Sequence, residues 1–103
     1  MTQRSAFVLR VRPEKVDAYL DAHRDVWPEL LDALRTAGIR NYTIFRAGNE
    51  MFGYFESDDL DRAASYPAGK EVSARWQDAM ANLLEERVPD AGPSRLEEVF
   101  RLD

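Results

Sequence analysis

The chain has 103 residues, of which 45% are hydrophobic and 32% charged, a composition typical of one globular domain. Its 14 basic and 19 acidic side chains give a formal net charge of -5, which argues against nucleic acid or an anionic membrane as a partner. Cysteine is absent, no apolar run is long enough for a transmembrane helix, and no signal peptide is recognisable, so we expect a cytoplasmic protein without disulfides or thiolate metal sites.

The first third of the chain predicts a strand and then an interrupted helical region. Residues Ser5 to Arg12 alternate as a strand does, with Phe7, Leu9 and Val11 on one face and Ala6, Val8 and Arg10 on the other. From Pro13 onward, apolar residues recur every three or four positions until Gly38, a natural helix end. Pro28 interrupts this pattern, so it either kinks one long helix or begins a second segment after a break near Trp27.

The rest of the chain predicts a hairpin, a second helical region and a last strand. The hairpin turns at Ala47-Gly48-Asn49. In chain order we expect strands at Ile39 to Arg46 and Met51 to Glu56, a helix capped by Asp58 or Asp59 that breaks at Tyr66 to Gly69, a second helical piece from about Lys70 to Glu86, a loop at Val88 to Ser94 and a strand at Leu96 to Leu102.

The order strand, helix, strand, strand, helix, strand is that of the ferredoxin-like split-βαβ fold, an α+β fold of the βαββαβ type. We therefore expect residues 1–103 to form a single domain, with a four-stranded antiparallel sheet and both helical regions on one face. The other face would carry apolar side chains that a domain of this size must bury. We expect a second copy to cover it, giving a homodimer of the dimeric α/β-barrel type.

The one histidine, His23, is the first candidate for chemistry, because imidazole is the natural acid or base near neutral pH. Tyr19 lies four residues before it and Trp27 four residues after it, so a continuous helix would place all three rings on one stripe. An aromatic stripe at helical spacing is also a common core pattern. Spacing alone therefore leaves a structural histidine and a binding site as equal interpretations.

Trp76 and Tyr42 are the next candidates. In a structural interpretation Trp76 belongs to the core and the Tyr42 hydroxyl reaches solvent at the sheet edge. In a functional interpretation their rings face a common cleft, which would suit a sugar, since sugars stack their C–H faces on aromatic rings and bond their hydroxyls to polar side chains. A metal site is not indicated by one histidine without cysteine, and the sequence contains no Gly-rich phosphate loop or GxSxG elbow.

These residues resemble the L-rhamnose mutarotase family over nearly the whole chain. The similarity begins with AFVLRV at Ala6 to Val11 and continues through Tyr19-x-x-x-His23-x-x-x-Trp27-Pro28-Glu29-Leu30. It includes Asn41-Tyr42-Thr43-Ile44, Arg75-Trp76 followed by Met80, and LEEVFRL at Leu96 to Leu102. The combination of the helix motif, the Asn-Tyr strand and the terminal segment is specific.

The resemblance implies a dimeric ferredoxin-like fold and interconversion of the α and β anomers of L-rhamnose, or of a related 6-deoxyhexose, at C1. It implies that His23 is the proton donor and that Tyr19 and Tyr42 contact the sugar. Family members commonly have two adjacent tryptophans in the second helix. Here the first is Trp76 and the second position is Gln77, which exchanges a stacking surface for an amide and bears on sugar preference.

Mutarotation opens the hemiacetal ring and closes it on the other face, so it requires no metal or redox cofactor. We expect His23 to protonate the ring oxygen, while Tyr19, Tyr42 or a bound water removes the C1 hydroxyl proton. Trp76 would hold the apolar face of the sugar, and Trp27 would either help it or belong to the core. Two alternatives remain at this point: a dimeric α+β-barrel monooxygenase acting on haem or polyketide substrates, and a sugar-binding or sensor domain without catalysis.

Overall fold

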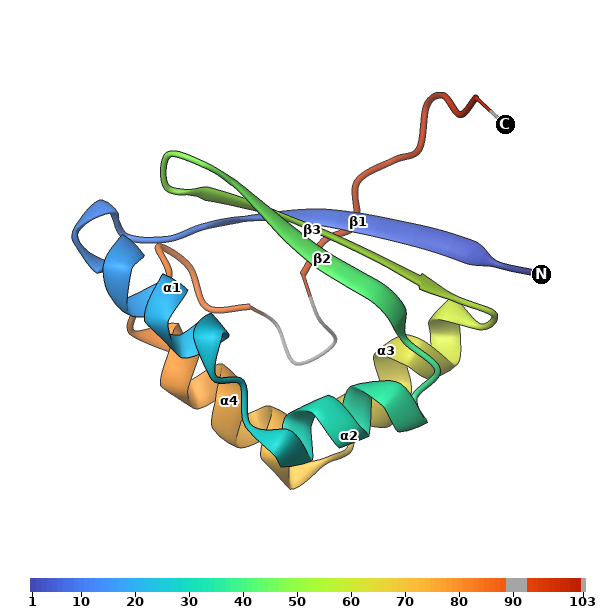
Figure 1. Ribbon diagram of the computed structural model, residues 1–103, viewed down its shortest axis with the longest axis horizontal. Helices are drawn as coiled ribbons and strands as arrows, with labels where there is room; N and C mark the ends of the chain where they lie inside the picture. The colour runs from blue at the N-terminus through green and yellow to red at the C-terminus, as the bar shows by residue number, and fades with distance from the viewer. Residues whose placement is uncertain (89–92, 103) are drawn as a thin grey trace.

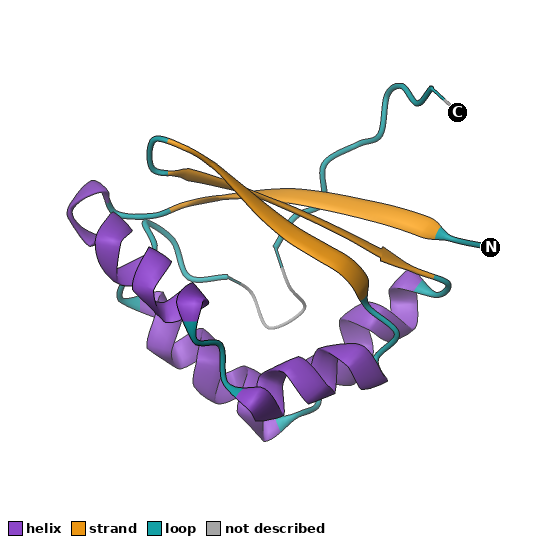
Figure 2. Cartoon of the chain, in the orientation of Figure 1, coloured by secondary structure: helices purple, strands orange, loops and turns teal. Residues whose placement is uncertain are grey.

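The computed structural model describes residues 1–88 and 93–102, which form one antiparallel sheet with a layer of helices beneath it (Figures 1 and 2). The strands are β1 (Gln3–Arg10), β2 (Arg40–Ala47) and β3 (Glu50–Ser57). The helices are the 3-10 turn η1 (Pro13–Lys15), α1 (Val16–Arg24), α2 (Pro28–Thr36), α3 (Leu60–Ala68) and α4 (Glu71–Ala81). The expected α+β class, with helices on one face of an antiparallel sheet, is confirmed.

The sheet has the order β1-β3-β2, and both pairings are antiparallel. β2 and β3 form the predicted hairpin, which turns through Gly48 at a φ of 61°. A positive φ costs glycine little, because glycine has no Cβ. On the helix-facing side Phe7 lies opposite Gly53, and on the outer side Phe45 lies opposite Phe52. This alternation sets which side chains can face the helices.

The prediction of a fourth strand at Leu96 to Leu102 is wrong for the described residues, whose sheet has three strands. The segment touches the free edge of β1 through one antiparallel bridge between Phe7 and Arg95, where the Leu96 amide donates to the Ala6 carbonyl at 2.7 Å. Beyond it, the apolar residues Val99, Phe100 and Leu102 are between 80% and 85% exposed. An alternating apolar pattern requires burial to hold a strand in place, and this chain alone provides none for these residues.

The interruption at Pro28 is a true break between two helices. α1 ends at Arg24, and Trp27 caps α2 in an extended conformation, with φ -56° and ψ 130°. The residue before a proline is driven out of the helical region by the proline ring, and the proline then fits the first position of the next helix. Of the two possibilities left by the sequence, the second segment is confirmed and the kinked helix is wrong.

The second helical region is also split, near the predicted break. Asp59 caps α3 by accepting the Arg62 amide at 3.1 Å, as expected for one of the two aspartates. The break was predicted to begin at Tyr66, but α3 continues to Ala68 and includes Pro67 in its last turn. The prediction that the next piece reaches Glu86 is wrong, because α4 ends at Ala81.

The chain leaves α4 early because it returns to the edge of the sheet. Leu84 forms a bridge with Val11, the Arg12 amide donates to the Leu83 carbonyl at 2.8 Å, and the Glu85 amide donates to the Arg10 carbonyl at 2.9 Å. These bonds replace the helical ones that a longer α4 would make. Of the predicted loop at Val88 to Ser94, residues 89–92 lie outside the described residues.

The main core lies between the sheet, α1 and α4, and a smaller core joins α2 to α4. The main core contains Val11, Val16, Tyr19, Met51, Met80, Leu84 and Val88, and the smaller one contains Leu30, Ala33 and Val72. Trp76 packs against both. Within residues 1–88 and 93–102, no helix is long and apolar enough to cross a membrane.

Candidate active site

Tyr19 and His23 lie one turn apart on the inner face of α1, where they form a stacked pair. Their ring centroids are 4.2 Å apart and their planes differ by 30°. Tyr19 is 4% exposed and belongs to the main core, whereas His23 is half-buried at its border. The imidazole therefore stands on a buried ring and keeps an accessible side.

A hydrogen bond fixes the orientation of the imidazole. Its Nδ1 lies 2.9 Å from the backbone carbonyl oxygen of Tyr19. A carbonyl oxygen only accepts, so Nδ1 must donate, and the neutral ring then carries its lone pair on Nε2. Nε2 is consequently the nitrogen of His23 that is left to exchange a proton with a ligand.

The two tryptophans extend this pair into a cluster, which we call the aromatic cluster: Tyr19, His23, Trp27 and Trp76. The Trp76 ring comes from α4 and meets the His23 ring edge-on, with centroids 5.4 Å apart and an interplanar angle of 83°. Trp27 meets Trp76 edge-on in turn, at 5.1 Å and 90°. Such perpendicular contacts are favourable for aromatic rings, because the positive edge of one ring meets the negative face of the other.

Trp27 contacts the cluster from the segment between α1 and α2, whereas the helical spacing predicted that it would lie on α1. It follows the end of α1, so the expected three-ring stripe on one continuous helix is wrong, although Tyr19 and His23 do share a stripe. The break before Pro28 carries the indole across to Trp76. Trp27 also packs against the smaller core of Leu30, Ala33 and Val72, so it has a structural role as well.

Tyr42 projects from β2 toward the helices and shares the inner face with Ile44. Its ring stacks on Phe55 at 5.6 Å and meets the edge of Phe7 at 6.1 Å. It keeps 41% of its surface exposed, which agrees with a ring at the border of the layer between sheet and helices.

The two phenols facing this layer hold their protons strongly. Burial raises the pKa of Tyr19 to about 12. Burial, and secondly the charge that Tyr19 would carry, raise the pKa of Tyr42 well above its usual value of 10.0. Because the Tyr19 charge affects Tyr42, the two phenols belong to one electrostatic environment. At neutral pH both phenols are hydrogen-bond donors rather than phenolate bases.

Gln77 follows Trp76 in α4 and is half-buried. Its amide makes no hydrogen bond within the described part of the chain, which leaves it available to a ligand. In the same part of the chain, no group of three or more His, Asp or Glu side chains is arranged to hold a metal ion.

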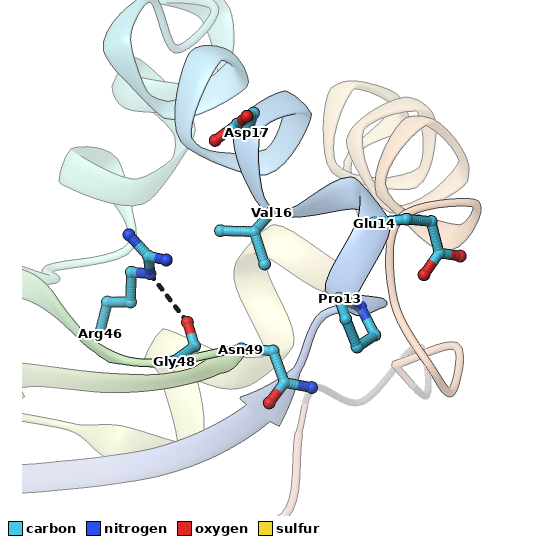
Figure 3. Close-up of a pocket in the computed structure, with 7 residues that line it drawn as sticks. All are labelled: Pro13, Glu14, Val16, Asp17, Arg46, Gly48 and Asn49. Atoms are coloured by element: carbon cyan, nitrogen blue, oxygen red, sulfur yellow. Dashed lines mark hydrogen bonds between the residues drawn. The ribbon is translucent and has the colours of Figure 1, made fainter.

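Two hollows open elsewhere on the surface. One, of about 380 Å³, lies between η1, the start of α1 and the β2–β3 turn, where Arg46 donates to the Gly48 carbonyl at 2.8 Å (Figure 3). The other, of about 570 Å³, lies at the opposite end of the sheet beside Arg4, Asp58 and Arg95. Neither is lined by the aromatic cluster or by any aromatic ring, so the candidate site is identified by its chemistry and contacts rather than by open volume.

Sequence reasoning missed the side chains that support the cluster from outside. Arg75, beside Trp76, pairs with Glu29 at 3.1 Å, and its guanidinium carbon lies 5.9 Å from the centre of the Trp27 ring. Arg75 directly precedes Trp76 in the sequence, and Glu29 follows Trp27 by two positions. That adjacency was the available signal, but only the fold shows that the two motifs meet.

The arrangement combines one proton-exchanging nitrogen, two phenolic donors and an indole wall. An aromatic wall suits an apolar face of a ligand, and the phenols suit its oxygens. The imidazole supplies acid–base chemistry near neutral pH. A small polyhydroxylated ligand that reacts by proton transfer fits this set.

Comparison with known proteins points to one family. The family model described as L-rhamnose mutarotase matches residues 4–102. The chain is 38% identical to an L-rhamnose mutarotase from Pectobacterium carotovorum, covering 97% of this chain and 98% of that protein. It is 32% identical to one from Oceanobacillus iheyensis, covering 98% and 99%.

Solved structures agree with these sequence relatives. The crystal structure of an L-rhamnose mutarotase from Formosa agariphila matches with a TM-score of 0.80 and 30% identity, covering 98% of this chain and 99% of that one. Tetracenomycin F2 cyclase from Streptomyces glaucescens, a type-II polyketide cyclase, matches with a TM-score of 0.54 and 24% identity, covering 98% and 97%. The second similarity concerns the fold alone.

Proposed function

The chain belongs to the L-rhamnose mutarotase family, and on that premise we propose that the aromatic cluster is where it interconverts the α and β anomers of L-rhamnose. It is an isomerase by family. The observation that carries the site assignment is the convergence of Tyr19, His23 and Trp76, which come from two separate helices. The polyketide cyclase supports no competing reaction, because its similarity is one of fold.

In the proposed mechanism His23 is the proton donor. Protonated on both nitrogens, it keeps Nδ1–H on the Tyr19 carbonyl and donates the Nε2 proton to the ring oxygen of the sugar. The bond between C1 and the ring oxygen breaks, the C1 hydroxyl loses its proton, and C1 becomes a carbonyl carbon. Rotation about the C1–C2 bond and the reverse steps close the ring with the other configuration.

The raised phenol pKa values assign the supporting roles. Since Tyr19 and Tyr42 remain protonated, they donate hydrogen bonds to sugar oxygens, and a bound water is the better acceptor for the C1 hydroxyl proton. Trp76 packs against the apolar face of the sugar, with Trp27 behind it. Positioned acid–base catalysis of this kind contributes roughly 10²- to 10⁴-fold.

Gln77 is the proposed determinant of sugar preference. Its amide stands where many family members present a second indole, so it exchanges stacking for hydrogen bonding. We expect the preference among 6-deoxyhexoses to depend on this position. The rates with L-rhamnose and L-fucose, measured for the parent protein and for Gln77→Trp, test it.

The proposal also includes a homodimer, with residues 1–103 as one mutarotase domain in the cytoplasm. Among the residues that the structure describes, no helix covers the outer face of the sheet (Figure 2), where Phe45 is 65% and Phe52 37% exposed. Paired charges flank these rings, Arg10 with Glu50 at 3.5 Å toward one end and Arg40 with Asp58 at 3.1 Å toward the other. An apolar centre between charges of both signs suits a second copy related by a two-fold axis.

Light scattering after size exclusion tests the dimer. Phe45→Asp should give a monomer, whereas Ala64→Asp, an exposed position on α3, should not change the mass. A monomeric parent protein, or a dimeric Phe45→Asp variant, would contradict this interface.

Exchange NMR on the anomeric protons of L-rhamnose tests the activity itself. The protein should accelerate α/β exchange, and His23→Ala should remove most of the acceleration while the circular dichroism spectrum stays unchanged. Arg24→Ala, the adjacent exposed position of α1, is the matched control and should retain full activity. Near-parental exchange in His23→Ala would refute the role of His23, and no exchange in the parent would refute the assignment of the reaction to this chain.

A further inference from the structure

The β2–β3 ladder contains a β-bulge at Asn41 and Tyr42. Arg40 pairs with Glu56 and Thr43 pairs with Tyr54, so β2 advances three residues while β3 advances two. Asn41 lies in the bulge with φ at 52°, and it is the one residue other than glycine with a positive φ in ranges 1–88 and 93–102. Asparagine tolerates this conformation better than most residues, and a bulge re-aims the side chains beside it.

Hydrogen bonds on the outer face of the sheet stabilise the bulge. The Asn41 side-chain amide donates to one carboxylate oxygen of Glu56 at 2.9 Å, and the Tyr54 hydroxyl donates to the other at 2.7 Å. The Glu56 carboxylate is therefore held from two sides by charge-assisted bonds. The Thr43 hydroxyl donates to the Asn41 carbonyl at 3.1 Å, which closes the bulge on the far side of Tyr42.

Tyr42 projects from this anchored segment to the opposite, helix-facing side. Its two neighbours in sequence, Asn41 and Thr43, both take part in the hydrogen bonds just described. On the inner side, Phe55 and Phe7 are the only aromatic contacts of the ring within residues 1–88 and 93–102, and these do not hold its hydroxyl. The direction of the phenol therefore depends on the backbone of the bulge.

We propose that Asn41 and Glu56 are positioning residues for sugar binding, which fix the bulge and thereby aim the Tyr42 phenol at the substrate. The inference rests on the proposed sugar contact of Tyr42. Neither residue touches the aromatic cluster, and both lie on the face of the sheet away from it. They act on the site through Tyr42 alone.

A positioning role and a structural role predict different losses. Asn41 is exposed and Glu56 half-buried, so their hydrogen bond contributes little to folding stability. A misdirected phenol, by contrast, weakens an aligned contact with the sugar. We expect Glu56→Ala and Asn41→Gly to raise KM for L-rhamnose roughly 3- to 10-fold, the value of one hydrogen bond, with kcat within about twofold of the parent.

Further variants separate the loss of the hydrogen bond between Asn41 and Glu56 from backbone strain and from the loss of charge. Glycine adopts a positive φ freely, so Asn41→Gly removes the amide without straining the backbone. Glu56→Gln keeps an oxygen that can accept the Asn41 amide and should restore part of the affinity. Glu50→Ala is the matched control, because Glu50 stands on the same strand and face but pairs with Arg10, and its KM should equal that of the parent.

A double-mutant cycle with Tyr42→Phe decides the matter. If Glu56 acts through the Tyr42 hydroxyl, Glu56→Ala should raise KM in the parent and add nothing in the Tyr42→Phe background. The inference would be overturned if Glu56→Ala raised KM equally in both backgrounds, or if neither Glu56→Ala nor Asn41→Gly changed KM. If Tyr42→Phe itself leaves KM unchanged, the failure lies with the proposed sugar contact of Tyr42. Light scattering on each variant shows whether a change in assembly, rather than in Tyr42, causes the loss.

Discussion

The ring of Tyr19 stacks on His23 at 4.2 Å, while the backbone carbonyl of the same tyrosine accepts the Nδ1 proton of that histidine at 2.9 Å. One residue thus orients the imidazole through both its side chain and its main chain. The main-chain contact is available to any residue at position 19, whereas the ring contact is not. Substitutions at position 19 can therefore separate the contributions of the hydroxyl and the ring, while the backbone carbonyl stays in place.

Tyr19→Phe should retain the stacked pair and lose only the phenolic donor. We expect a higher KM for L-rhamnose and a melting temperature close to that of the parent. Tyr19→Ala should cost about 3–5 kcal/mol in the free energy of unfolding, because a 4% exposed aromatic ring leaves a cavity in the main core. Urea unfolding and anomer-exchange kinetics on both variants check this, and an equal stability loss in the two would show that the hydroxyl is structural.

Gly53→Ala should destabilise the protein. A Cβ at this position would lie 2.2 Å from Cζ of Phe7 and under 3 Å from two further atoms of that ring, so the ring must move. Overpacking of this kind costs about 1–3 kcal/mol. Gly69→Ala is the control, because its Cβ would meet its nearest neighbours at an ordinary 3.8 Å. A stable Gly53→Ala variant would mean that Phe7 can leave its place beside Tyr42 at little cost.

Alkaline conditions should weaken the fold through the two phenols whose pKa is raised, those of Tyr19 and Tyr42. An unfolded tyrosine loses its proton near pH 10, but the folded pKa of Tyr19 is about 12 and that of Tyr42 is also raised. In this interval the folded state binds more protons than the unfolded state, so the stability present below about pH 10 is lost as pH rises toward about 12. Urea unfolding across this range should show a smaller slope for Tyr19→Phe, and an unchanged slope would rule out this phenol as the source.

Arg75→Ala should change the environment of the tryptophans but have little effect on the free energy of unfolding. The guanidinium lies over the Trp27 ring and pairs with Glu29, but both members of the pair are largely exposed, so the expected loss is below about 1 kcal/mol. Trp27 and Trp76 are the only tryptophans in the chain, and the emission spectrum therefore reports on the surroundings of these two rings. Arg87→Ala, which removes a pair with Asp78, should leave the spectrum unchanged.

Local rules predicted most of the elements. Pro28 and Asp59 acted through backbone sterics and capping, which depend only on near neighbours. The end of α4 was predicted too late because Leu84 pairs with Val11, a contact that no local pattern contains. The last strand failed for a related reason, since the apolar residues of LEEVFRL match a strand pattern whether or not this chain offers a surface to bury them.

The candidate site divides in the same way. Helical spacing brought Tyr19 and His23 together, and strand alternation put Tyr42 on the inner face. The meeting of His23 with Trp76 could not be derived from spacing, because it depends on how α1 packs beside α4. The resemblance supplied that pairing, and the roles of these residues in the reaction remain predictions.

The rings of the candidate site come from α1, the break before α2, β2 and α4, so its parts are separated by much of the chain. Contacts between distant segments form only after the intervening loops have closed, which makes them late events in folding. During synthesis, a chain that has emerged only as far as the hairpin carries the histidine and both phenols but lacks the Trp76 wall. Catalysis should thus appear together with the complete fold, so that the rate of anomer exchange serves as a measure of how much of the chain has reached its native state.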